Sequence, residues 1–193
     1  RVCQTCVAGQ YGVGGATCEQ CPLGFFQHQG EKSSCHSCDM DDDPNNQIVG
    51  NKYADEVGST GCKVCAVGRY SSNYETCDSL CPTGWSGEEG YCQPCISAHY
   101  SDQEGLENCK QCGPGKYQDE FPVSGNTECK TCAAGKYSTG GGSACYTCTE
   151  CAAGKGVTTA CTATTNRVCQ TCVAGQYGVG GGTCEQCPLG FFQ

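Results

Sequence analysis

The stretch CVAGQY, residues 6–11, places a glycine three residues after a cysteine and an aromatic residue two positions after the glycine. Glycine allows a turn with positive φ directly after the cysteine, and the aromatic ring can lie against a disulfide. The spacing C-x-x-G-x-[YF] returns as CPLGFF at Cys21 and Cys187, CAVGRY at Cys65, CGPGKY at Cys112, CAAGKY at Cys132 and CVAGQY at Cys172. Each motif predicts one small module that needs little other apolar packing.

Three stretches depart from the motif. Ala98 replaces the glycine in CISAHY, Trp85 comes one residue early in CPTGWS, and Gly156 replaces the aromatic residue in CAAGKG. We expect a local change of structure at each. The aromatic residues that we expect to be exposed include Phe25, Phe26, Tyr74, Tyr91 and Trp85, and a single exposed aromatic residue is ordinary on a protein surface.

Composition excludes one large core. The chain has 24 cysteines among 193 residues, whereas Leu, Ile, Val and Phe together number only 23. A disulfide that closes about 15 residues contributes about 3 kcal/mol by restricting the unfolded chain, so many disulfides can replace a core. We therefore predict a small disulfide-rich fold: an extended rod of tandem cysteine-rich modules with short β-hairpins and little or no helix.

The same composition predicts where the chain works. Disulfides on this scale form outside the reducing cytosol, so we expect an extracellular protein, secreted or at the cell surface. No run of 18 apolar residues occurs, and we expect no membrane contact in this segment. Twenty acidic residues against 11 basic ones, without a Lys/Arg cluster, argue against nucleic acid as a partner.

The eleven C-x-x-C pairs suggest a simple pairing rule, in which the first cysteine closes one module and the second opens the next. The rule gives short loops throughout. The bonds that it predicts are Cys6–Cys18, Cys21–Cys35, Cys38–Cys62, Cys65–Cys77, Cys81–Cys92, Cys95–Cys109, Cys112–Cys129, Cys132–Cys145 and Cys172–Cys184.

The rule breaks once, in the stretch CYTCTECAAGKGVTTACTATTNRVC. Its first cysteine, Cys145, closes the preceding module, and two interleaved bonds, Cys148–Cys161 and Cys151–Cys169, use the four cysteines that follow. Cys3 and Cys187 remain unpaired within these 193 residues. We expect their partners to lie in neighbouring copies of the repeat described next.

Residues 1–27 and 167–193 agree at every position except Ala16, which is Gly182 in the second copy. We expect one complete long unit at 1–166, made of serial modules, and the start of a near-identical unit at 167–193. The modules within the unit have diverged, yet the two copies have not. This contrast favours a protein whose function is to form a long molecule with regular contacts between its copies. We expect the natural polypeptide to continue in both directions with this period of 166 residues.

The serial C-x-x-G-x-[YF] units resemble the ephrin-receptor-like cysteine-rich repeats of large secreted and cell-surface proteins. The interleaved block resembles the second half of a tumour necrosis factor receptor cysteine-rich domain. The pairing scheme of such repeats supports the rule given above. The segment 38–62 departs from the pattern: it keeps KYADE at 52–56, similar to KYQDE at 116–120, but carries an acidic insertion before it.

Two metal sites compete with these interpretations. Cys3, Cys6, Cys18 and Cys21 have zinc-ribbon spacing, but the unbroken run of cysteines favours disulfides, and we expect no zinc. The carboxylates of Asp39, Asp41, Asp42 and Asp43 are ligands that Ca²⁺ prefers. Because this loop does not follow the EF-hand pattern, a solvated acidic loop is the favoured interpretation and no cofactor is expected.

Neither catalysis nor redox exchange is indicated. The three histidines lie in no catalytic motif, and a redox C-x-x-C is normally single and begins a helix. We predict a non-enzymatic structural protein that builds a filament or surface fibre with copies of itself, as in mastigoneme-like flagellar hairs or surface coats. Other surface proteins or glycans are further possible partners. The alternative is a receptor or adhesin ectodomain with a ligand-binding face.

Overall fold

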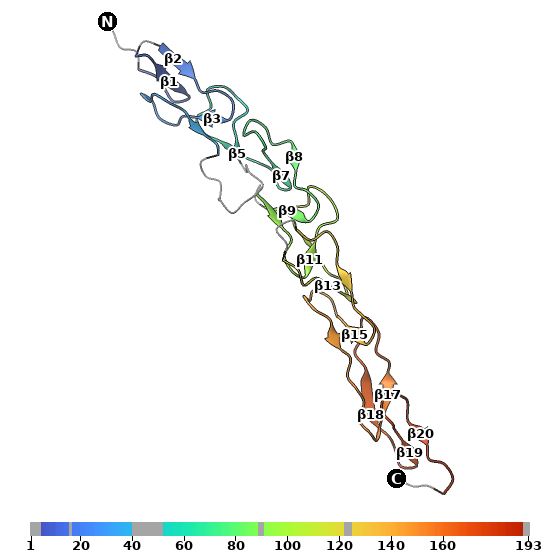
Figure 1. Ribbon diagram of the computed structural model, residues 1–193. Coiled ribbons are helices and arrows are strands. Elements are labelled where there is room, and N and C mark those ends of the chain that lie inside the picture. The colour runs from blue at the N-terminus through green and yellow to red at the C-terminus, as the bar shows by residue number, and fades with distance from the viewer. Residues whose placement is uncertain (1–4, 16, 40–51, 89–90, 122–124, 191–193) are drawn as a thin grey trace. The chain divides into compact units, whose positions relative to one another are not determined.

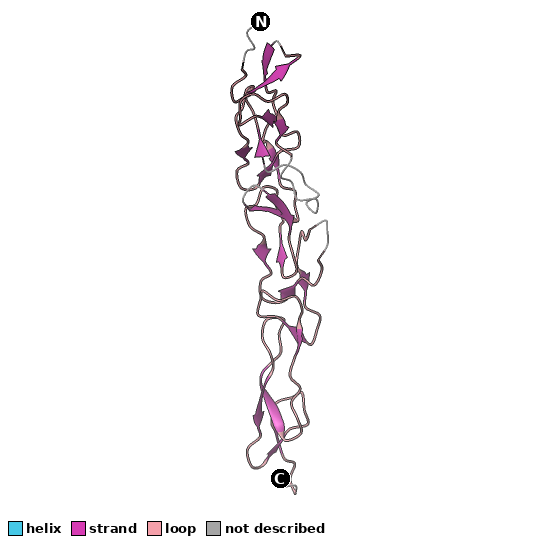
Figure 2. Ribbon diagram, turned by 90° about the vertical axis from the view of Figure 1, so that its left-hand side faces the viewer, coloured by secondary structure: helices cyan, strands magenta, loops and turns pink. Residues whose placement is uncertain are grey.

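The computed structural model describes residues 5–15, 17–39, 52–88, 91–121 and 125–190. Within these ranges the chain has no helix, and its strands form two-stranded antiparallel hairpins (Figures 1 and 2). Among these described residues, no hairpin joins another into a larger sheet. Most buried apolar residues are cysteines, which confirms the prediction of a small disulfide-rich fold without a large core.

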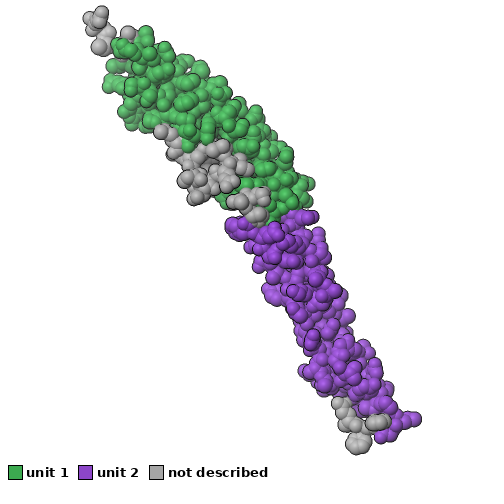
Figure 3. All heavy atoms as spheres, viewed as in Figure 1, with its two compact units in different colours: residues 1–95, 101–109, 122–127 green, residues 96–100, 110–121, 128–193 purple. Residues whose placement is uncertain are grey.

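The chain comprises two compact units, coloured separately in Figure 3. Unit 1 comprises residues 1–95, 101–109 and 122–127, and unit 2 comprises residues 96–100, 110–121 and 128–193. The hairpins described in unit 1 are β1 (Gln10–Val13) with β2 (Thr17–Gln20), β3 (Phe25–Phe26) with β4 (His36–Ser37), β5 (Lys52–Tyr53) with β6 (Lys63–Val64), β7 (Arg69–Tyr70) with β8 (Ser79–Leu80) and β9 (Trp85–Glu88) with β10 (Tyr91–Pro94).

The hairpins described in unit 2 have the same form, and one of them is irregular. They are β11 (His99–Tyr100) with β12 (Lys110–Gln111), β13 (Lys116–Tyr117) with β14 (Lys130–Thr131), β15 (Lys136–Tyr137) with β16 (Tyr146–Thr147), β17 (Lys155–Thr159) with β18 (Val168–Thr171) and β19 (Gln176–Tyr177) with β20 (Glu185–Gln186). The register of β17 with β18 shifts between Val157 and Thr159.

The module between Cys65 and Cys77 shows how the motif folds. The amide of Arg69 donates to the carbonyl of Ala66 across a tight turn, and Gly68 in that turn has φ 74°. Such a turn needs positive φ at its third residue, which glycine adopts without strain. The amide of Cys81 then donates to the Gly68 carbonyl and ends the hairpin.

The three departures from the motif have different outcomes. Ala98 keeps the turn geometry at φ 65°, a conformation that non-glycine residues rarely adopt. The expectation that Trp85 is exposed was wrong: it is 8% exposed and packs with Cys81 and Cys92, with Tyr70 against them. This indole buries a large apolar area where few other apolar residues exist. Gly156 is also buried.

Candidate functional site

Eleven disulfides close the modules among the described residues, and each spans 11 to 24 residues of sequence. They join the same cysteine pairs as the alternating rule and the interleaved block. Loops near 15 residues gain about 3 kcal/mol each from such closure. Within the described ranges, half-buried Cys187 has no disulfide partner, and Cys3 lies outside those ranges.

A recurring backbone hydrogen bond joins seven of the described turns to the module that follows. The amide of the turn glycine, or of Ala98 in its place, donates to the carbonyl of the residue directly after the aromatic position in the next module. We call that acceptor the junction residue. The bonds are Gly9–Gln27, Gly24–Ala54, Gly68–Gly87 and Gly84–Ser101 in unit 1, and Ala98–Gln118, Gly115–Ser138 and Gly154–Gly178 in unit 2, with N···O distances of 2.7 to 2.9 Å.

At Gln27, Gly87 and Gln118, two further backbone bonds support the junction. The amide of the junction residue donates to a loop carbonyl of the next module, as Gly87 does to Leu106 at 2.8 Å. A loop amide of that next module donates to the carbonyl of the cysteine that opens the junction residue's own module, as Gly105 does to Cys81 at 2.8 Å. Because the donors and acceptors belong to the backbone, modules with different side chains can use the same junction.

At the junction of Ser101, a side chain takes the place of the loop amide that donates to the opening cysteine elsewhere. Asn126 is 3% exposed, and its Nδ2 donates to the Cys95 carbonyl at 2.9 Å. Its own carbonyl accepts the amide of Ser101 at 2.8 Å. The buried amide side chain thus satisfies a backbone acceptor that a loop N–H satisfies elsewhere.

The junction residues include buried polar side chains that sequence reasoning missed. Gln118 is 4% exposed, its Nε2 donates to the Glu128 carbonyl at 2.8 Å, and its Oε1 accepts the amide of Glu120 at 3.1 Å. Gln27 makes the equivalent pair of bonds within its own loop. The available signal was positional, because Gln, Ser, Ala or Gly directly follows the aromatic residue in module after module.

Turn glycines also make room for a loop two modules further on. A Cβ atom on Gly9 would overlap the carbonyl oxygen of Gly58, and one on Gly68 would overlap that of Gly105. In contrast, a Cβ on Gly135 would meet no atom within 4 Å. Some motif glycines are therefore required for close approach as well as for positive φ.

The similar stretches KYADE and KYQDE hold a lysine in the same way. Lys63 Nζ lies 2.6 Å from Asp55 Oδ1, and Lys130 Nζ lies 2.7 Å from Asp119 Oδ1 and 2.6 Å from Glu120 Oε1. Hydrogen bonds to these lysines lower the pKa of both aspartates. Because all these groups are exposed, the pairs contribute little stability.

The predicted calcium loop lies mostly outside the described residues. Asp39 is exposed and its amide lies 3.4 Å from Ser37 Oγ, while Asp41, Asp42 and Asp43 lie beyond the described ranges. In the part of the chain that the structure describes, no group of three His, Cys, Asp or Glu side chains is arranged to hold a metal ion. Calcium binding by the acidic insertion stays a prediction.

Comparison with known families identifies one segment. Residues 132–169 match the TNFR/NGFR cysteine-rich region. This segment contains the bond Cys132–Cys145 and the interleaved pair, and folds of this kind are typically non-enzymatic. No curated protein matches the chain. The ephrin-receptor-like resemblance of the other modules stays a prediction.

The disulfides and the receptor-type segment together indicate an extracellular or cell-surface protein. Among the described residues, no helix has the length and apolar composition needed to cross a membrane.

Proposed function

We propose that this chain is part of an extracellular structural protein in which disulfide-stapled modules follow one another in tandem and build a filament or surface fibre. The observation that carries the proposal is a junction across the boundary of the 166-residue repeat. The amide of Gly154, before the boundary, donates to the carbonyl of Gly178 at 2.9 Å, and that of Val157 donates to Gly182 at 2.8 Å.

These bonds are of the same kind as those between modules inside the repeat. The disulfide Cys151–Cys169 also crosses the boundary, so the end of one repeat and the start of the next are linked covalently. Repeats can therefore be added in series without a new type of contact, as in other tandem-repeat proteins. This property suits a protein whose function is to provide length.

The single difference between the two copies is compatible with the same junction. A Cβ atom on Gly182 would meet no atom within 4 Å, and the bond from Val157 uses only the Gly182 carbonyl. An alanine, as at position 16 of the first copy, is therefore sterically acceptable there. Both copies carry the sequence needed to receive a preceding module.

Expression of one, two and three tandem 166-residue repeats tests the proposal. We expect the contour length in electron microscopy to rise by a constant increment per repeat, and we expect antibodies against the chain to label fibres on the source cells. Compact particles whose length does not grow with repeat number would contradict the tandem arrangement. Uniform labelling of the plasma membrane without fibres would contradict the filament role.

The match of residues 132–169 to a receptor cysteine-rich region favours one alternative, a receptor or adhesin ectodomain. That function requires few repeats, a membrane anchor and a ligand that binds one face. The size of the natural polypeptide separates the two functions. Many repeats would favour the fibre, whereas a few repeats followed by a transmembrane segment would favour the receptor.

A further inference from the structure

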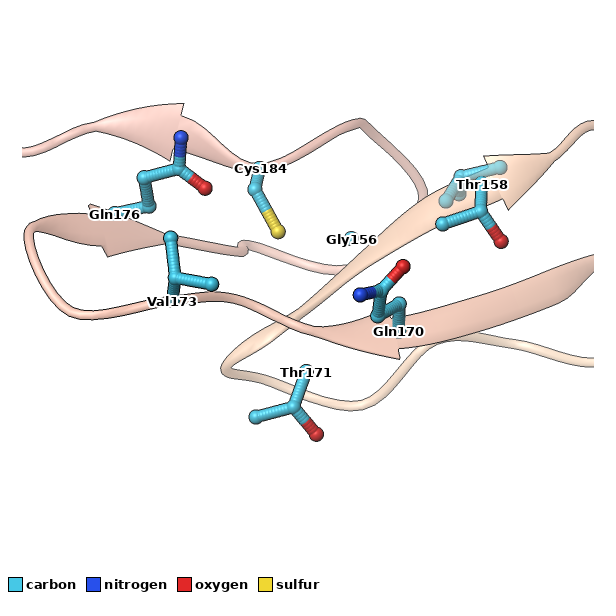
Figure 4. Close-up of a pocket in the computed structure, with 8 residues that line it drawn as sticks. Gly156, Thr158, Gln170, Thr171, Val173, Gln176 and Cys184 are labelled. Atoms are coloured by element: carbon cyan, nitrogen blue, oxygen red, sulfur yellow. The ribbon is translucent and has the colours of Figure 1, made fainter.

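A hollow of about 220 Å³ lies where strands β17 and β18 meet the following module, within unit 2 (Figure 4). Gly156 stands on its wall, at the position that holds Tyr or Phe in the C-x-x-G-x-[YF] motif. A Cβ atom there would overlap the backbone nitrogen of Cys184. The next module therefore approaches the backbone of Gly156 directly, and Gly156 itself carries no aromatic ring that could cover the space beside it.

Neutral polar side chains line this hollow. Gln170 comes from β18, Gln176 from β19 and Thr158 from β17, and Thr171 ends β18 (Figure 4). Thr158 Oγ1 donates to the carbonyl of Val168 at 3.2 Å. Within the described part of the chain, the side chains of Gln170, Gln176 and Thr171 have no hydrogen-bond partner. Two amides and a hydroxyl are thus available to a ligand.

The lining discriminates between classes of ligand. None of the lining side chains carries a charge, so neither an anion nor a cation finds a counter-charge there, and the net charge of −9 further disfavours anions. A wholly apolar ligand would leave the amides of Gln170 and Gln176 without partners, which costs free energy. Val157 and Val173 add apolar contact area.

A ligand that fits is neutral, presents several hydroxyl groups and has a partly apolar ring face. We propose that this hollow binds one ring of a neutral saccharide. Each glutamine amide can both donate to and accept from sugar hydroxyls, and the valine methyl groups contact the C–H face of the ring. The hollow is smaller than the roughly 300–1,000 Å³ of drug-sized sites, so most of a longer glycan stays in solvent and we expect Kd on the order of millimolar.

The two copies of the repeat supply a matched control. Gln10 in the first copy corresponds to Gln176 in the second, with the same neighbours in sequence, but it is not among the lining residues of the hollow. Gln10→Leu thus makes the same chemical change outside the proposed site. Disulfide mapping of each variant establishes that folding is retained.

The experiment is a titration of the isotope-labelled full chain with neutral mannan, β-glucan and galactan oligosaccharides, and with sulfated heparin fragments, followed by nuclear magnetic resonance. We expect at least one neutral oligosaccharide to shift the amide resonances of Gln170 and Gln176. Gln170→Leu and Gln176→Leu should each weaken that binding at least about tenfold, and Gln10→Leu should leave it unchanged. Binding only by heparin, equal weakening by Gln10→Leu, or no shift at tens of millimolar neutral sugar would each overturn the proposal.

Discussion

The carbonyl oxygen of Gly58 occupies the space where a Cβ atom on Gly9 would lie, although the two residues belong to modules that are not consecutive. Gly9 also has φ 82°, so its lack of a side chain serves both a turn and a close approach. Gly135 has a similar φ of 78° but open space around its missing Cβ. Comparison of Gly9 with Gly135 therefore distinguishes two roles of the motif glycine: positive φ in the turn, and close approach of another module.

We expect Gly135→Ala to cost about 1 kcal/mol, the strain of alanine in the left-handed region. Gly9→Ala should cost more, by a further ~1–3 kcal/mol, because the backbone must also move away from the new methyl group. Hydrogen exchange at the amide of Gly58, which donates to the Cys21 carbonyl, reports the local loss of packing. Equal costs for the two variants would refute the close-approach role.

Ala98→Gly should stabilise its junction by about 1 kcal/mol, because Ala98 is held at φ 65° without being glycine. Protection of the residue 98 amide, which donates to the Gln118 carbonyl at 2.7 Å, should rise about fivefold. Ala134 lies in the equivalent turn of another module and is not at positive φ, so Ala134→Gly should be mildly destabilising. The same sign of effect for both variants would contradict this account.

Gln118→Ala should lower the local free energy of opening by about 1–3 kcal/mol, because it leaves the Glu128 carbonyl and the Glu120 amide without their partner. Gln103→Ala is the control, since Gln103 is exposed and its side chain makes no such pair of bonds in the described structure. Amide exchange across residues 116–131 measures the effect. A loss no larger than that of the control would show that the buried amide is dispensable.

Two tyrosines should respond alike to alkaline pH. The Tyr11 hydroxyl donates to Glu19 Oε2 at 3.1 Å, and in the second copy the Tyr177 hydroxyl donates to Glu185 Oε2 at 2.9 Å. The hydrogen bond to each carboxylate raises the pKa of the phenol above its ordinary value of 10.0. The interaction is therefore fully present below pH 10 and is lost as the pH rises through the raised pKa.

Ring resonances followed against pH test this pair of interactions. Glu19→Gln should return the pKa of Tyr11 toward 10, and Glu185→Gln should do the same for Tyr177. Each substitution should leave the other tyrosine unchanged. A titration that is unaffected by removal of the carboxylate would exclude it as the cause.

Full reduction should abolish the folded structure, since the disulfides replace a core that 23 large aliphatic and phenylalanine residues cannot supply. We expect the oxidised chain to tolerate heat and the reduced chain to show no cooperative melting by circular dichroism. Cooperative melting after complete reduction would reveal a core that the buried cysteines and Trp85 do not account for.

The local architecture followed from the sequence. The spacing of cysteine, glycine and aromatic residue predicts a closed turn and a short hairpin, because each feature acts within one module. The stretches KYADE and KYQDE are similar in sequence, and each holds a lysine of its own closing strand. Such relationships span few residues and depend on backbone geometry that a short motif fixes.

The contacts between modules were decided only by the tertiary structure. Nothing in the motif indicates that Gly154 bonds Gly178 or that Gly9 faces a loop two modules away, because these contacts depend on how successive hairpins stack. Trp85 shows how far the sequence alone can predict the structure. Its displacement by one residue is visible in the sequence, but its burial against Cys81–Cys92 is not. Short-range spacing determines each module, whereas the partners of its backbone N–H and C=O groups are set by the neighbour that satisfies them.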